Sequence, residues 1–173
     1  MRIDPKAEQA TRQMLGHAMR GELSEIPKIA QSAGDERVFR ESISLCLLIA
    51  GYIAIDVCGS EWPTTTSLHK IAENVAQAEN EFRLDANRVY DYLEKAALGF
   101  QPLDEVFPTA EEKALWPILI TASMLLTYSA KDRDQWDYLD DIEEGLEASA
   151  AVKPSITPAM ILRAHMPKDG GSR

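Results

Sequence analysis

The stretch ERVFRESISLCLLIAGYIAIDVC, residues 36–58, decides the fold. Its first turns mix apolar and charged side chains at helical spacing, whereas its second half is apolar on almost every side. Asp35 precedes the stretch as an N-cap, and Gly59 follows it as a stop signal. A helix that is apolar all round must be covered by other elements, so we expect it at the centre of a helical bundle.

A second apolar stretch, AEEKALWPILITASMLLTYS at residues 110–129, predicts another central helix. Thr109 and Glu112 have the spacing of a capping box, which marks the beginning of this helix. Pro117 lies inside the apolar run. Because proline has no N–H to donate, we expect it to kink the helix or to shift its true start.

Amphipathic patterns on either side predict further helices that cover the two central ones. Asp4-Pro5 marks the start of the first and Gly21 its end, and residues 101–108 are expected to be a connector. The other covering helices are expected at residues 24–33, 67–79, 85–97 and 134–148. No convincing strand pattern occurs.

These elements predict an all-α fold, a single-domain helical bundle of about seven helices around the central helices 36–58 and 110–129. Residues 1–153 are expected to form the bundle. Residues 154–173 follow Lys153-Pro154 and are expected to add a short helix, 158–165, and a flexible tail.

The charge balance restricts the classes of partner. The 173 residues include 28 acidic and 18 basic ones, a net charge of −10. This argues against nonspecific binding to nucleic acid or to an anionic membrane, because both need an excess of Lys and Arg. The first twenty residues lack the apolar region of a signal peptide, and the apolar run 43–57 is short for a bilayer. We expect a soluble, cytoplasmic protein.

Motifs for catalysis, metals and cofactors are missing from the sequence. Cys46 and Cys58 lie on one predicted helix, roughly 18 Å apart, so we expect free, buried thiols rather than a disulfide. The three histidines lie on three different predicted elements, and no paired-cysteine, His-Glu-x-x-His, phosphate-loop or nucleophile-elbow pattern occurs. We therefore predict no catalytic residue, no metal ligand and no cofactor.

The most informative local feature is an acidic helix near the C-terminal end of the bundle. Residues 132–147 hold eight acids and one base. At 100° per residue, four of the acids form one narrow stripe, and three apolar residues lie about 170° from it. The stripe consists of Asp137, Asp140, Asp141 and Glu144; the apolar residues are Leu139, Ile142 and Leu146.

This pattern favours a non-enzymatic protein-interaction module, such as an inhibitor, immunity protein, adaptor or chaperone, that binds a basic partner through the anionic face. The simpler interpretation is a solvated face that keeps an acidic protein soluble, and a weak divalent-cation site is a further alternative. The predicted partner-binding residues are Asp134, Trp136, Asp137, Asp140, Asp141, Glu144 and Glu147.

Two other functions stay open at this point. Helices 67–79 and 85–97 resemble a helix-turn-helix in length and could serve a DNA-associated regulator, although acids outnumber bases there. Carboxylates converging on a cavity would instead indicate a metal-dependent enzyme. Trp62, Trp116 and Trp136 cannot all be placed in the core from sequence, so a homo-oligomer is also considered.

Overall fold

The computed structural model describes residues 3–32, 34–59, 61–78, 84–99, 101–129 and 134–152, without the side chains of residues 149–152. A 3₁₀ turn, η1 (Leu23–Glu25), precedes α2 (Ile26–Ser32), and a π-helical turn, η2 (Tyr92–Ala97), continues α5 (Ala86–Asp91). The described α-helices are α1 (Pro5–Met19), α2 (Ile26–Ser32), α3 (Glu36–Val57), α4 (Thr65–Ala78), α5 (Ala86–Asp91), α6 (Leu103–Val106), α7 (Ala110–Tyr128) and α8 (Gln135–Val152). These residues contain no strand, which confirms the all-α expectation.

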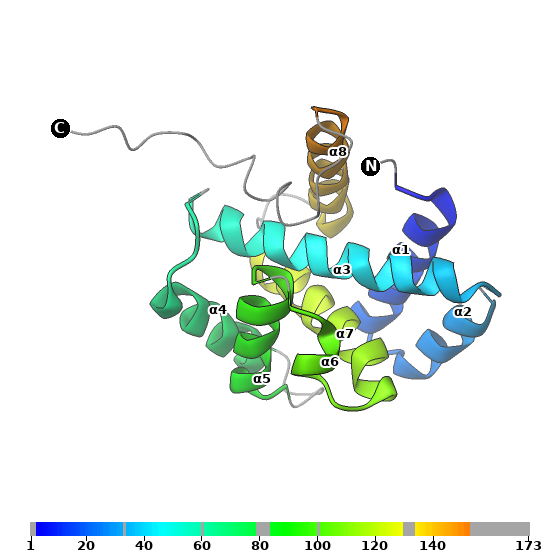
Figure 1. Ribbon diagram of the computed structural model, residues 1–173, viewed down its shortest axis with the longest axis horizontal. Coiled ribbons are helices and arrows are strands. Elements are labelled where there is room, and N and C mark those ends of the chain that lie inside the picture. Colours follow the sequence, from blue (N-terminus) through cyan, green and yellow to red (C-terminus); the bar gives the residue numbers. More distant parts are fainter. Residues whose placement is uncertain are drawn as a thin grey trace.

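The two apolar helices lie at the centre of the bundle, as predicted. Figure 1 shows α3 crossing the middle of the molecule, and α3 packs against α1, α7 and η2. Ile49 and Ile53 of α3 and Met124 and Leu125 of α7 are completely buried. Removing each such side chain from water stabilises the fold by about 1.5–3 kcal/mol.

Burial also shows what kind of helix α3 is. By length and composition α3 could cross a membrane, with a mean hydropathy of 1.7, but 67% of its apolar window is buried inside the bundle. The helix also includes charged residues in its first turns, so it extends beyond the apolar stretch. Its surroundings are those of a core helix.

Local signals at the helix ends agree with the sequence. Asp4 accepts a hydrogen bond from the Lys6 N–H, and Asp35 accepts one from the Arg37 N–H. The predicted capping box is complete, with Thr109 and Glu112 bonded in both directions. These caps satisfy amides that have no partner inside the helix.

Pro117 does not have the predicted effect on the start of α7. The helix begins at Ala110 and continues through Pro117, which is buried. Of the two expected effects, the shifted start is therefore wrong, and the kink stays a prediction. The absent N–H leaves only the carbonyl of Lys113 without its usual donor. Packing of the apolar residues around Pro117 outweighs that loss.

The region expected as one helix at 85–97 and a connector at 101–108 is more complex. The α-helix ends at Asp91 and continues as the π-helical turn η2, and the connector contains the short helix α6. In the wider π turn, four residues share a buried side: Tyr92, Leu93, Ala96 and Ala97. The tight return at Gly99 brings the backbone close to the carbonyls of Glu94 and Lys95.

Both cysteines are free, as expected. The predicted burial of Cys58 is wrong: it is half-buried, because it lies at the C-cap of α3, where the helix leaves the core. Cys46 is fully buried, and this burial raises the pKa of its thiol to about 12. The Thr121 hydroxyl donates a 3.1 Å hydrogen bond to the Cys46 carbonyl and so joins α7 to α3. The helix and tail predicted for residues 154–173 lie outside the described residues.

Candidate functional site

The acidic helix α8 buries the face that the sequence predicts. Figure 1 shows α8 standing across α3, near the start of the chain. Leu139, Ile142 and Leu146 are buried, together with Tyr138. The direction of the apolar face is therefore confirmed, and it fixes which acids point outward.

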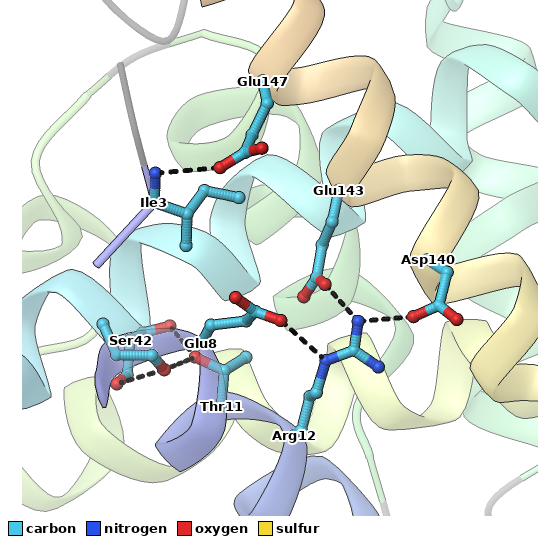
Figure 2. Close-up of polar contacts among 9 residues, drawn as sticks. Ile3, Glu8, Thr11, Arg12, Ser42, Asp140, Glu143 and Glu147 are labelled. Carbon is cyan, nitrogen blue, oxygen red and sulfur yellow. Dashed lines mark hydrogen bonds and ion pairs between the residues drawn. The ribbon is translucent and has the colours of Figure 1, made fainter. Parts of the chain in front are cut away.

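An arginine of α1 lies at the centre of the contact with α8. In Figure 2 the Arg12 guanidinium reaches toward two carboxylates of α8, Asp140 and Glu143. It forms ion pairs with Asp140 at 2.5 Å and with Glu143, and its Nε lies 3.3 Å from Glu8 of its own helix. When all three carboxylates are ionised, the group has a net charge of −2.

Glu143 is the buried member of this group. Glu143 is 6% exposed, and one of its two carboxylate oxygens has no hydrogen-bond partner among the described residues. Burial raises the pKa of Glu143 to about 7, although Arg12 opposes the shift; Glu8 and Asp140 add to it by repulsion. This carboxyl therefore changes its charge near neutral pH.

Three further contacts attach α8 to the bundle. The Tyr138 hydroxyl donates a 2.8 Å hydrogen bond to Asp56 of α3. Glu147 accepts one from the backbone N–H of Ile3 at 3.3 Å. The Trp136 ring covers Gly16 of α1, where a β-carbon would lie 3.4 Å from it. These contacts fix α8 along its length.

The predicted partner-binding residues thus separate into two groups. Asp140, Glu147 and Trp136 contribute to the attachment of α8, and the Asp134 carboxylate accepts a hydrogen bond from the backbone N–H of Trp136 at 3.3 Å. The rest are Asp137, Asp141 and Glu144, which are all exposed. We call these three residues the outer face of α8. Asp140, the fourth residue of the predicted stripe, is also exposed but pairs with Arg12. The binding role of the stripe stays a prediction.

The outer face is a defined line of charge. Asp137, Asp141 and Glu144 follow one another at helical spacing over about 10 Å of α8. Asp141 also lies near Tyr52, whose hydroxyl has a raised pKa because of burial and then because of Asp56 and Asp141. The face is therefore anionic and extends toward α3.

The alternative of a carboxylate metal site gains no support from this region. Among the residues that the structure describes, no group of three or more His, Cys, Asp or Glu side chains is placed to hold a metal ion. The cation between Glu8, Asp140 and Glu143 is the guanidinium of Arg12.

Arg88 and Lys95, the basic residues of the second helix of the helix-turn-helix alternative, are engaged within the fold. Arg88 pairs with Glu112 at 2.5 Å and lies over the Trp116 ring, 5.2 Å from its centroid. Lys95 pairs with Asp91 at 3.0 Å. Contact with a phosphate would have to compete with these internal partners.

The three tryptophans are half-buried and pack against the core. Trp116 also stacks on the buried ring of Phe107, with centroids 5.6 Å apart. These positions are those of rings that cover the ends and sides of a bundle. Self-association stays a prediction.

Comparison with models of known protein families, with curated proteins and with solved structures finds no match for this chain. Its function therefore has to be inferred from the residues themselves.

Sequence reasoning missed Arg12 and Glu143 as a joined pair. Glu8 and Arg12 show a visible i, i+4 pattern on one helix. The contact between Arg12 and Glu143, however, joins residues 131 positions apart in the sequence, so no local pattern predicts it. Glu143 differs from its acidic neighbours only in lying between the apolar and the acidic side of α8.

Proposed function

We propose that this protein is a non-enzymatic interaction module that binds a basic segment of another protein on the outer face of α8. One observation carries the proposal: Asp137, Asp141 and Glu144 are exposed in one line on a helix that the bundle holds in place. A fixed line of charge loses little conformational entropy on binding, since the helix is already ordered.

The electrostatics of α8 support a cationic partner. Residues 134–152 contain seven acids and no Lys, Arg or His, and Arg12 of α1 neutralises one of these charges. Like charges three or four positions apart repel by a few tenths of a kcal/mol per pair. Basic side chains bound along this face would relieve that repulsion and would be steered toward it.

The proposal can be tested with a charge-neutralised variant. Asp137→Asn, Asp141→Asn and Glu144→Gln remove the outer charges and leave the Arg12 contacts intact. The matched control is Glu73→Gln, Glu105→Gln and Glu111→Gln, which neutralises three exposed acids on other helices. Each protein is used to capture partners from lysate of the native host, and bound proteins are quantified by mass spectrometry.

The expected result is one basic protein that the wild type and the control capture and that the α8 variant loses. Raising the salt concentration should release this protein, because ions screen exposed charges within about 8 Å at physiological ionic strength. Equal capture by the α8 variant and the wild type would contradict the proposal and leave the acids as solubilising groups.

A further inference from the structure

A pocket of about 380 Å³ lies away from α8, where the end of α3, the start of α4 and the end of α7 meet. This is the side of the molecule on which α3 leads into α4 in Figure 1. Its size falls within the range of pockets that hold small molecules in proteins. Neither the sequence patterns nor the proposed function of α8 involves it.

One wall of the pocket is apolar and partly open to solvent. Trp62 and Ile71 contribute to it, and so does Val57, which is 40% exposed. Only one other large hydrophobic side chain among the described residues, Leu126, is similarly exposed. An exposed aliphatic group on a pocket wall is stabilised when an apolar ligand covers it.

The other wall carries polar groups. The Asn74 side-chain amide donates a 3.2 Å hydrogen bond to the Tyr128 hydroxyl, which can still act as a donor. Lys70 and Glu61 also line the pocket. Both are exposed, and neither forms an ion pair with the other or with another residue that the structure describes. Opposite charges thus line one pocket without being paired.

We infer that this pocket binds a small zwitterion with an apolar side chain, the chemical class of the free hydrophobic amino acids. Glu61 would receive the ammonium group and Lys70 the carboxylate, with the apolar side chain against Val57, Trp62 and Ile71. A ligand with a single charge would leave one of the two protein charges without a partner. The pairing therefore provides selectivity as well as affinity.

The test uses three related probes and the full chain. L-phenylalanine carries both charges, N-acetyl-L-phenylalanine lacks the ammonium, and L-phenylalaninamide lacks the carboxylate. Each is titrated to millimolar concentration while ¹H–¹⁵N spectra are recorded. The expected result is a saturable shift of the Trp62 indole and of the Asn74 and Ile71 amides with L-phenylalanine, and about two- to fivefold weaker binding of each analogue.

Two variants identify the charges. Lys70→Met should weaken L-phenylalanine binding to the level of the amide, and Glu61→Gln should weaken it to the level of the acetylated probe. Lys28→Met, which removes a lysine on α2, is the matched control and should leave binding unchanged. No shift at these residues with any probe, or equal binding of all three probes, would overturn the inference.

Discussion

Glu143 shows at the scale of one residue how position sets chemistry. Its neighbour Glu144 points outward, whereas Glu143 is buried beside Arg12. The folded pKa of about 7 lies above the ordinary value of 4.5, so the folded protein keeps a proton that the unfolded chain has released. Protonation of Glu143 therefore contributes to the free energy of unfolding. This contribution is fully present below pH 4.5 and is lost as the pH rises through 7.

Glu143→Gln should therefore become more stable relative to the wild type as the pH rises, because glutamine carries no charge at any pH. Between about pH 5 and about pH 8, the difference in unfolding free energy should change by on the order of 1–3 kcal/mol in favour of the variant. Urea unfolding at the two pH values measures it. Glu144→Gln, which removes the exposed neighbouring carboxylate, is the control. Equal pH dependence of the two variants, or a constant difference for Glu143→Gln, would contradict the assignment.

Two tyrosines allow a matched comparison of buried hydroxyls. Tyr92 is completely buried beside Thr121, and its hydroxyl makes no hydrogen bond of normal geometry within the described residues, whereas the Tyr138 hydroxyl donates to Asp56 at 2.8 Å. Tyr92→Phe should thus be neutral or stabilising, while Tyr138→Phe should cost about 0.5–1.5 kcal/mol. Thermal unfolding measures the stability of both variants relative to the wild type. A larger loss of stability for Tyr92→Phe than for Tyr138→Phe would show that the Tyr92 hydroxyl has a partner.

At the scale of elements, the π-helical turn depends on a close backbone approach. A β-carbon at Gly99 would overlap the Glu94 carbonyl oxygen and lie 2.9 Å from that of Lys95. Gly99→Ala should consequently destabilise the fold by about 1–3 kcal/mol. The comparison variant is Gly145→Ala in α8, where the β-carbon would lie 3.5 Å from the Tyr52 ring, an ordinary contact. It should gain about 0.5–1 kcal/mol, since alanine suits a helix interior better. Chemical denaturation measures the change in stability of each variant. Equal changes for Gly99→Ala and Gly145→Ala would argue against the tight turn at Gly99.

The attachment of α8 to α1 makes a second prediction at this scale. Arg12→Met leaves Glu8, Asp140 and Glu143 without their shared cation, so α8 should lose about 2–3 kcal/mol of docking stability. Amide hydrogen exchange should accelerate mainly in α8. Adding Glu143→Gln should recover part of the loss, because the buried charge is then gone.

The control for this prediction is Arg40→Met, which removes an exposed pair with Glu36 inside α3. It should change stability by about 0.5 kcal/mol or less. If Arg12→Met were equally mild, or if exchange increased evenly over the whole bundle, Arg12 would not hold α8.

Local patterns predicted most of the elements for clear physical reasons. The caps at Asp4, Asp35 and Thr109 and the apolar residues of α4 and α8 depend on neighbours within a few positions. The π-helical turn η2 and the unshifted start of α7 before Pro117 did not follow from local preference, which packing of the whole core can override.

At the scale of the whole molecule, the candidate site was predictable only in part. Helical periodicity identified the acidic stripe, but it could not show that Arg12 binds Asp140 or that Trp136 covers Gly16. Both contacts join the two ends of the described chain, so they exist only once the bundle has formed. The pocket beside Trp62 likewise needs α3, α4 and α7 together.

Site-specific photocrosslinking tests the central claim, that the outer face of α8 receives a basic partner, most directly. A photoreactive residue in place of Ala148, which is exposed one turn beyond Glu144, leaves every acid intact. The same residue in place of exposed Gln77 on α4 serves as the control. In host lysate, position 148 should crosslink to one basic protein at low salt and lose it at high salt, while position 77 should not. Identical adducts at both positions, or adducts indifferent to salt, would contradict the account.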